Sequence, residues 1–425
     1  SEAAKMLLSA LGYDTEVYGF TGIDWSINTN KIANSIDAKL YDGLRGIDPS
    51  VALDRDSTAQ MVYNALNAKT KEMVPTTSTN GTIEYTYTNG DTLLYAKYGA
   101  VRVEGVVTGN EFTSNSESMK GKTYVAITNN DELTNQIMGK NYGSVVNFSA
   151  NFDVESGKEE FGRAVIVYAK PSAASPRNMA KAEVICEVIL DDDNNAVATT
   201  TKGFGSGKNI YDFAKDNGMK LEDYDATAGA HNAAFYTNYA NVGPTAMAGA
   251  GDVSKFGYYG ASTFGTANKY AYTNSIGTEI IMIDNDADGI VDVVLQNVYD
   301  FGQVTKYSTK DDGSVSVRTG GSLGFSNEEL KNIVAYEGIA KDDYVTVTKV
   351  DDTYYLEKAK VVTGNLDAFK RESGAIKNVT VDGETFDKSA VATYAGTESL
   401  AGVTTTNISN TSLNNDGDFY LDHFG

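Results

Sequence analysis

The segment Tyr344-Val-Thr-Val-Thr-Lys-Val350 alternates Val with polar residues. Because successive side chains of a strand point to opposite faces, this alternation predicts a half-buried β-strand. The segment Val101-Arg-Val-Glu-Gly-Val-Val107 has the same pattern. From about residue 76 onward the chain is rich in Thr, Val, Tyr, Gly and Asn. We therefore expect mainly β domains there, of barrel-like or sandwich-like form.

Short Asn-Gly and Asp-Gly pairs separate many of these strand-like segments. Both residues of such a pair tolerate positive φ angles, which the tight turns of β-hairpins require. The sequence therefore predicts hairpin turns at Asn89-Gly90, Asp312-Gly313, Asp382-Gly383 and Asp416-Gly417.

The first 70 residues have a helical pattern instead. Ala4, Leu7, Leu8 and Leu11 are spaced to form one apolar helix face, and Gly12 suits the end of that helix. Asp24 and Asp54 are suited to cap two further helices. The apolar faces expected for these two helices consist of Ile32, Ile36 and Leu40, and of Ala59, Val62 and Leu66.

Residues 1–70 resemble the S-layer homology module of bacterial cell-surface proteins. The resemblance is carried by Ser1-Glu-Ala-Ala-Lys-Met-Leu-Leu-Ser-Ala-Leu-Gly12, Asp24-Trp-Ser-Ile-Asn28 and Leu53-Asp-Arg-Asp-Ser57, followed by Ala59-Gln-Met-Val-Tyr-Asn-Ala-Leu66. The family motif has the form Ile-Thr-Arg-Ala-Glu, and this chain keeps its Arg but not its Thr or Glu. Residues 1–12 look like the closing helix of a preceding repeat, so the chain holds one repeat and part of another.

The resemblance implies attachment to an anionic secondary cell-wall polysaccharide on a Gram-positive-type bacterium, with Asp24, Trp25 and Arg55 at the binding site. Arg55 would offer a forked donor to a carboxylate beside a helix N-terminus, and Trp25 would offer a flat face to a sugar ring. Two alternatives stay open. Arg55 could pair with Asp54 or Asp56, and Trp25 could belong to the core.

The composition excludes several classes of protein. With 35 basic and 57 acidic side chains, the net charge of −22 disfavours binding to nucleic acid, which requires basic patches. No apolar run approaches the length needed to span a bilayer. The single Cys186 cannot form an intrachain disulfide, and its apolar surroundings predict a buried thiol. Only His231 and His423 are available for His-dependent catalysis, and no nucleophile motif accompanies either, so we expect no enzyme.

One metal-binding motif is present. Asp284-Asn-Asp-Ala-Asp-Gly-Ile-Val-Asp292 has the Asp-x-Asp-x-Asp-Gly spacing of a calcium loop, with apolar strand-like segments on both sides. Oxygen ligands without His or thiol favour Ca²⁺, and the expected ligands are Asp284, Asp286, Asp288 and Asp292. Leu295 occupies the twelfth position, where an EF-hand needs Glu, so this loop is not an EF-hand. The alternative is a solvated Asp/Gly turn, which is also the interpretation of Asp191-Asp-Asp-Asn-Asn195.

The sequence divides into four parts: the S-layer homology module (1–72), a β domain (76–170), an α+β domain with the calcium-type loop and a 210–275 insertion (171–302), and a β domain that continues beyond the chain end (303–425). Together with the resemblance, this predicts an extracellular structural protein that assembles with copies of itself into a lattice or filament, with calcium aiding assembly. The alternative is an anchored adhesin or glycan-active enzyme.

Overall fold

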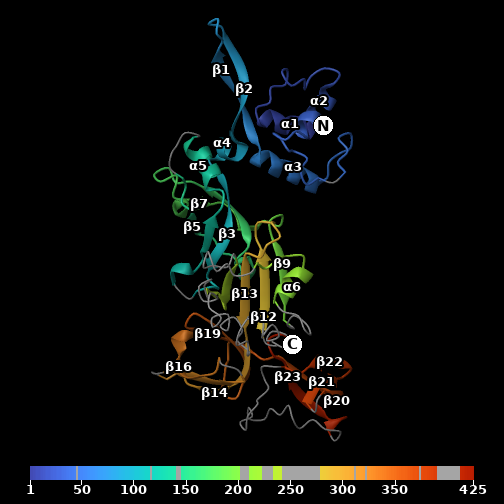
Figure 1. Ribbon diagram of the computed structural model, residues 1–425, viewed down its shortest axis with the longest axis vertical. Coiled ribbons are helices and arrows are strands. Elements are labelled where there is room, and N and C mark those ends of the chain that lie inside the picture. The colour runs from blue at the N-terminus through green and yellow to red at the C-terminus, as the bar shows by residue number, and fades with distance from the viewer. Residues whose placement is uncertain are drawn as a thin grey trace. The chain divides into compact units, whose positions relative to one another are not determined.

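The computed structural model describes most of the chain, and Figure 1 labels its helices and strands. The described residues are 1–44, 46–114, 117–139, 145–201, 210–222, 233–241, 278–310, 313–320, 323–372, 375–389 and 412–425. They are mainly β and form several sheets, as the sequence predicts. His231, Asp312 and most of the 210–275 insertion lie outside the described residues.

The chain divides into two compact units. The first comprises residues 1–105, 125–154 and 166–189, and the second comprises 106–124, 155–165 and 190–425. The four-part division of the sequence stays a prediction.

The first unit begins with three helices, α1 (Glu2–Ala10), α2 (Trp25–Ala33) and α3 (Arg55–Asn67). Gly12 follows α1 with a φ of 88°, as a helix-ending glycine should. Asp54 caps α3 as predicted, because its carboxylate accepts a hydrogen bond of 2.7 Å from the Ser57 amide. Asp24 occupies the N-cap position of α2, but its side chain makes no capping hydrogen bond.

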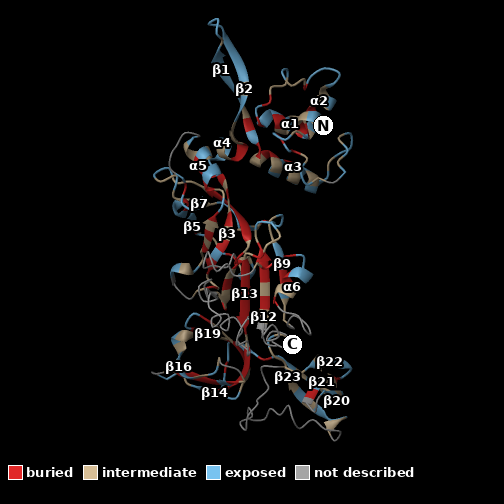
Figure 2. Ribbon diagram, in the orientation of Figure 1, coloured by how far each residue is buried: buried red, intermediate tan, exposed pale blue. Residues whose placement is uncertain are grey.

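One apolar core joins these helices. Ala4, Leu8 and Leu11 are buried in it, as the helical spacing predicts. The predicted faces of the other two helices are partly wrong. Ile36 is 84% exposed because α2 ends at Ala33, and Val62 is 42% exposed because α3 turns a different face to the core, burying Met61 and Ala65. Figure 2 shows the mixture of buried and exposed residues on α1, α2 and α3.

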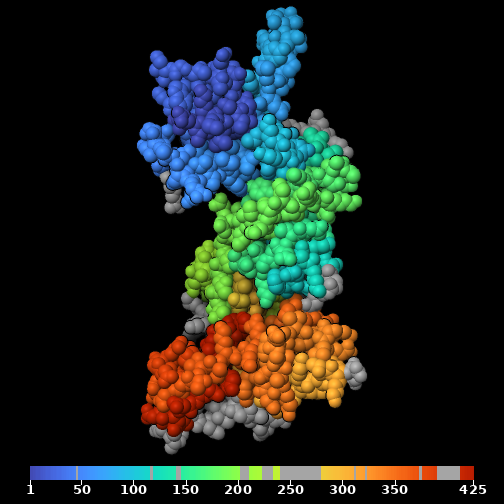
Figure 3. Space-filling view, turned by 180° about the vertical axis from the view of Figure 1, so that it is seen from behind, coloured from blue at the N-terminus to red at the C-terminus, as the bar shows by residue number. Residues whose placement is uncertain are grey.

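A long hairpin follows the helices, formed by β1 (Lys69–Thr77) and β2 (Ile83–Thr92). Most of its residues are exposed, and its tip stands away from the helices in Figures 1 and 3. The predicted turn at Asn89-Gly90 is wrong, because both residues lie inside β2. A larger residue at Gly90 would require neighbouring side chains to move. A β-carbon on it would come within 2.8 Å of the Thr70 hydroxyl.

A six-stranded sheet has the order β5-β4-β3-β6-β7, with β8 also paired to β6. Val101, Val103 and Val107 point to its buried face, which confirms the alternation predicted for this strand. Cys186 lies between β7 and β8 and is exposed, so the predicted buried thiol is wrong. The elements of this region are α4 (Leu93–Tyr98), β3 (Val101–Asn110), η1 (Glu117–Met119), β4 (Thr123–Ile127), α5 (Asn130–Met138), β5 (Ser149–Phe152), η2 (Lys158–Glu160), β6 (Ala164–Lys170), η3 (Met179–Lys181), β7 (Glu183–Val184) and β8 (Ile189–Leu190).

The second unit contains a five-stranded sheet of order β11-β10-β13-β12-β9. Its elements are β9 (Ala196–Thr200), α6 (Ile210–Asp216), β10 (Ala234–Thr237), β11 (Ala240–Asn241), β12 (Thr278–Asp284) and β13 (Val293–Val298). Helix α6 buries Ile210 and Ala214 against Phe235, Met282 and Val294 of the sheet. β12 and β13 pair antiparallel and are buried, so the loop between them is held at the end of a central hairpin.

Two further sheets of the second unit have the orders β16-β15-β14-β18-β19-β17 and β22-β21-β20-β23. Strand β18 spans Tyr344–Val350, as the sequence predicts. Asp382 and Gly383 have φ angles of 47° and 81° between β21 and β22, which confirms that predicted turn. The elements are β14 (Asp300–Tyr307), β15 (Ser314–Thr319), β16 (Phe325–Glu329), η6 (Leu330–Asn332), β17 (Ile333–Ala335), β18, β19 (Thr353–Lys358), β20 (Val361–Glu372), β21 (Ala375–Val381), β22 (Glu384–Asp387) and β23 (Asp416–Tyr420).

Candidate functional site

The loop 284–292 connects β12 to β13, in the strand–loop–strand arrangement that the sequence predicts. The last ladder pair before the loop is Ile283 with Val293. Two residues of the loop have positive φ, 60° at Ala287 and 82° at Gly289. Gly289 therefore permits the sharp turn, because a residue without a β-carbon adopts this conformation at little cost.

Three carboxylates converge in this loop. One oxygen each from Asp284, Asp286 and Asp292 lies within 4.8 Å of the other two. Asp284 is 2% exposed, Asp292 is half-buried and Asp286 is exposed, so the group runs from the interior to the surface. No Lys or Arg of the described residues forms an ion pair with any of the three. Such a group can hold a metal ion through hard oxygen ligands.

Backbone amides orient the carboxylates. Asp284 Oδ2 accepts a hydrogen bond of 2.9 Å from the Gly289 amide, and Asp292 Oδ2 accepts one of 2.8 Å from the Asn285 amide. Each carboxylate has a second oxygen or further lone pairs for another ligand. The loop is therefore shaped by its own hydrogen bonds, and a cation would complete the coordination of oxygens that are already turned toward one another.

The loop is also tied to the rest of the second unit. The amide of Lys220 donates to the Gly289 carbonyl at 2.9 Å, and the amide of Val291 donates to the Lys220 carbonyl at 3.0 Å. The side-chain amide of Asn285 donates to the Gly162 carbonyl at 2.9 Å. Contacts from these two segments fix the loop on both sides, which lowers the ordering cost of binding an ion.

The electrostatics of the loop favour a cation. Burial raises the pKa of Asp292 above its ordinary value, and the charges of Asp286, Asp284 and Asp288 add to this effect against the opposing hydrogen bond from Asn285. Like charges held close together disfavour the ionised form. A divalent cation would relieve both the repulsion and the desolvation.

Of the four predicted ligands, the structure groups three. Asp288 is outside the group, and one of its oxygens accepts a hydrogen bond of 2.7 Å from the Ile290 amide. The spacing in the sequence identifies the acidic positions of such a loop, but it does not separate a carboxylate that faces the ion from one that caps the turn.

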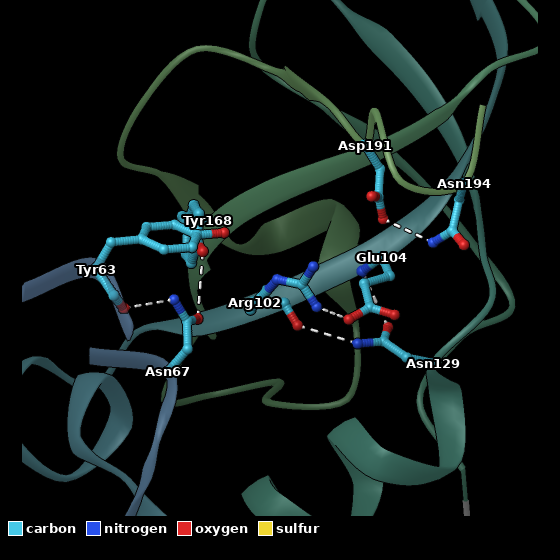
Figure 4. Close-up of polar contacts among 8 residues, drawn as sticks. All are labelled: Tyr63, Asn67, Arg102, Glu104, Asn129, Tyr168, Asp191 and Asn194. Atoms are coloured by element: carbon cyan, nitrogen blue, oxygen red, sulfur yellow. Dashed lines mark hydrogen bonds and ion pairs between the residues drawn. The ribbon is translucent and has the colours of Figure 1, made fainter. Parts of the chain in front are cut away.

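The other acidic turn, at 191–195, is held by hydrogen bonds of its own side chains. The Asp191 carboxylate is buried and accepts a hydrogen bond of 2.9 Å from the Asn194 side chain, as Figure 4 shows. The Asn195 side chain donates to the Ala164 and Asp191 carbonyls. This agrees with the interpretation of that segment as a turn.

The predicted polysaccharide-binding residues lie at two helix starts. Asp24 and Arg55 are exposed, and Trp25 is half-buried with the Lys5 ammonium 5.4 Å from its ring centroid. Among the described residues, Arg55 forms no ion pair, and no hydrogen bond links it to Asp24 or Trp25. The structure thus brings Asp24 and Trp25 together as chain neighbours, with Arg55 on a separate helix.

A polar groove that the sequence does not reveal lies elsewhere in the first unit. It has a volume of about 390 Å³ and is lined by Asp37, Lys39, Asp42, Asn64, Asn67 and Lys69, among others. Its residues come from three separate stretches of the chain, so no local motif marks it. Asn67 also accepts a hydrogen bond of 3.2 Å from the Tyr168 hydroxyl, which fixes one wall (Figure 4).

Comparison with known proteins gives no match: neither a protein-family model, nor a curated protein, nor a solved structure matches this chain. Among the described residues, no helix is long and apolar enough to cross a lipid bilayer.

Proposed function

We propose that this chain is a structural protein of the bacterial cell surface, which assembles with copies of itself and binds Ca²⁺ in the loop 284–292. In this proposal residues 1–72 are an S-layer homology module that attaches the chain to a cell-wall polysaccharide. The observation that carries the proposal is the convergence of Asp284, Asp286 and Asp292, whose ligand oxygens lie within 4.8 Å of one another.

The choice of Ca²⁺ follows from the ligands and their setting. All three are carboxylates, and hard oxygen ligands favour Ca²⁺ or Mg²⁺ over transition metals. Mg²⁺ demands near-ideal octahedral geometry and keeps several waters, whereas Ca²⁺ accepts irregular sets of carboxylate and carbonyl oxygens. A loop with one buried and two more accessible carboxylates suits the more tolerant ion.

The net charge supports a link between calcium and assembly. Copies that each carry a charge of −22 repel one another unless cations reduce that charge. Neutralising a partly buried carboxylate group in the second unit would also stiffen the sheet from which the loop projects. Assembly that requires Ca²⁺ is the expected behaviour.

The support for attachment is the resemblance of residues 1–70, together with the three-helix core that they form. Arg55 is exposed at the first residue of α3, where its guanidinium is available to a carboxylate of an acidic sugar. The polar groove near Lys39 and Lys69 offers a second surface for the same polysaccharide.

The test is electron microscopy of the purified chain in millimolar Ca²⁺ and again with a chelator, beside calorimetric titration with Ca²⁺. Ordered sheets or filaments that dissolve on chelation are expected. The variant Asp284→Asn/Asp286→Asn should lose both binding and assembly. The control variant Asp192→Asn/Asp193→Asn removes the same charge from the exposed part of another turn and should keep both.

Two outcomes would contradict different parts of the proposal. Calcium binding without any assembly would remove the structural role while leaving the metal site. Assembly that is equal in calcium and in chelator, with no calorimetric signal, would remove the metal site.

A further inference from the structure

The second unit contains a small pocket with aromatic walls. Its volume is about 160 Å³, and its lining includes the rings of Phe112, Tyr239, Tyr299 and Tyr355. These residues come from four separate stretches of the chain. At ~30 Å³ per water molecule, the space holds roughly five waters, so its occupant would be a single small ring rather than an extended chain.

The turn that carries Tyr239 is strained. Asn238 and Tyr239 join β10 to β11 with φ angles of 47° and 68°. Such a two-residue turn usually has Gly in the second position, because a bulky side chain at positive φ is unfavourable. The Tyr239 ring is held in place by an edge-on contact with Phe161, at a centroid distance of 5.3 Å. Strain of this kind persists where the surrounding structure requires it, and it clusters at ligand-binding sites.

The wall of the pocket that contains Tyr299 is also held in place by contacts between aromatic rings. The Tyr299 ring stacks on the His423 ring with centroids 3.6 Å apart, and the Phe424 ring meets it edge-on at 5.5 Å. Since both tyrosines are fixed by other aromatic rings, the pocket needs little reordering when a ligand enters. Preorganisation of this kind reduces the cost of binding.

Two side-chain amides lie beside these rings, and one of them keeps a group without a partner among the described residues. Asn238 accepts a hydrogen bond of 2.7 Å from the Val298 amide through Oδ1, and its nitrogen has no partner among the described residues. Asn297 is 5% exposed, donates to Glu279 at 2.9 Å and also forms a side-chain hydrogen bond with Tyr239, and its Oδ1 is fully buried. The contact with Glu279 fixes which end of the Asn297 amide is the oxygen. The pocket thus has one amide donor, the Asn238 side-chain nitrogen, without a partner among the described residues.

The charges around the pocket select against an acidic ligand. Burial, followed by the charge of Glu279, raises the pKa of Tyr239 to about 12 against the opposing hydrogen bond with Asn297, and Glu159 adds to the rise. Burial also raises the pKa of Tyr299, with further contributions from Glu279 and Glu357. Both hydroxyls therefore stay protonated near neutral pH and can donate hydrogen bonds. Among the described residues that line the pocket, the only cation is Lys158, which is exposed.

We propose that this pocket binds one neutral sugar ring, through stacking on Tyr239 and Tyr299 and through a hydrogen bond that the Asn238 side-chain nitrogen donates to one of its hydroxyls. A pyranose has an apolar face for an aromatic ring and hydroxyls that both donate and accept. Its size suits the pocket, and its neutrality suits the nearby glutamates. The site gives the second unit a glycan-binding activity separate from the attachment of residues 1–72.

The experiment is titration of the full chain with the methyl glycosides of glucose, galactose, mannose and N-acetylglucosamine, followed by saturation-transfer NMR and calorimetry. We expect at least one to bind with a dissociation constant of about 1 mM. Tyr239→Gly should weaken that binding at least about tenfold. The substitution suits the turn, because Gly adopts its φ angle freely, so the fold should survive.

The matched control is Tyr307→Ala, which removes a partly exposed tyrosine of β14 outside the pocket and should leave binding unchanged. Tyr355→Ala provides a second test from β19, should Tyr239→Gly alter the thermal unfolding curve. No binding by any of the four glycosides at about 10 mM would overturn the proposal. Undiminished binding by both pocket variants would overturn it as well, and so would binding of choline in place of the sugars, because an aromatic cage can instead hold a quaternary ammonium.

Discussion

The rings of Tyr299 and His423 lie parallel, at an interplanar angle of 4° and a centroid distance of 3.6 Å. The stack joins residues that are far apart in the chain, one directly after β13 and the other after β23. Glu357 Oε2 also lies 3.4 Å from His423 Nδ1. The segment 421–425 is thereby fastened to the second unit by a side chain that the sequence marks only as an isolated histidine.

Replacement of His423 should show how much this ring stack stabilises the second unit. His423→Ala should lower the free energy of unfolding of the second unit by about 1 kcal/mol, the usual contribution of an aromatic pair beyond its buried area. His423→Phe keeps a ring and should retain most of the stability. Thermal unfolding of the three proteins checks this. Equal losses in both variants would assign the effect to the Glu357 contact instead.

Two N-cap aspartates of the first unit form a matched pair for a test of helix capping. Asp54 accepts a hydrogen bond from the Ser57 amide, and this bond and the Ser57 side chain lower the pKa of Asp54. Asp24 makes no capping bond. Asp54→Ala should therefore destabilise the first unit in urea titrations, whereas Asp24→Ala should change it little.

The pH dependence of this cap has a definite sign. Because the folded-state pKa of Asp54 lies below its unfolded value, the stabilisation is present above the unfolded pKa and is lost as the pH falls through the folded one. The difference in the free energy of unfolding between wild type and Asp54→Ala should become smaller at acidic pH. A difference that stays constant down to strongly acidic pH would contradict the capping role.

Replacement of Gly162 by a residue with a side chain should destabilise the second unit. The φ of Gly162 is 78°, and a β-carbon there would lie 3.1 Å from side-chain atoms of both Ile283 and Val293. Gly218 has a φ of 79° but no atom within 4 Å of the same position. Gly162→Ala should thus cost about 1–3 kcal/mol more than Gly218→Ala, since overpacking adds to the shared backbone strain. Thermal unfolding measures the difference, and equal costs would mean that the neighbours of Gly162 move aside freely.

The cation loop should give the chelated protein a distinctive pH profile. Burial and the nearby carboxylates raise the pKa of Asp292 above 3.8, so the folded state holds this proton more tightly than the unfolded state. Stability in chelator should therefore fall as the pH rises from about 4 through the raised pKa. In Ca²⁺ this fall should disappear, because the bound ion stabilises the ionised carboxylate.

Two variants test the assignment of that profile to Asp292. Asp292→Asn should flatten the profile in chelator, whereas Asp193→Asn should keep it. Thermal unfolding across the pH series, with and without Ca²⁺, provides the measurement. A profile that is the same in wild type and Asp292→Asn would assign the titration to another group.

Some local patterns in the sequence predict local structure in this chain, but the hairpin turn predicted at Asp416-Gly417 is wrong, because both residues lie inside β23. The Val and Thr alternation marks β18, and the Asp-x-Asp-x-Asp-Gly spacing marks a turn between two strands. Both depend on residues that are close in sequence. The wrong predictions concern residues whose conformation or burial depends on contacts with distant parts of the chain. Asn89-Gly90 fits a hairpin turn, but Asn89 pairs with Lys71 and Thr92 pairs with Lys69, so β2 continues through both residues. Cys186 has apolar neighbours, yet β7 ends at Val184 and leaves the thiol exposed.

Neither the polar groove of the first unit nor the aromatic pocket of the second unit could be predicted from the sequence, for the same reason. Phe112, Asn238, Asn297 and Tyr355 have no sequence pattern in common, and they come from four separate stretches of the chain that meet at one cavity. One local signal was available. Asn-Tyr stands at 238–239 where a tight turn favours Asn-Gly, and a bulky residue at such a position often has a role in binding.

The register of the β12–β13 hairpin determines how it responds to mechanical load. Thr278 and Val298, where the chain enters and leaves the hairpin, are paired with each other, and the carboxylates lie at the opposite end. Tension along the chain would therefore separate the residue pairs of this hairpin one after another, starting at Thr278 and Val298 and reaching the loop last. A bound ion would add to the equilibrium stability of the sheet but little to the force that starts its opening. For a protein under tension, resistance to the first rupture must come from the strands on either side.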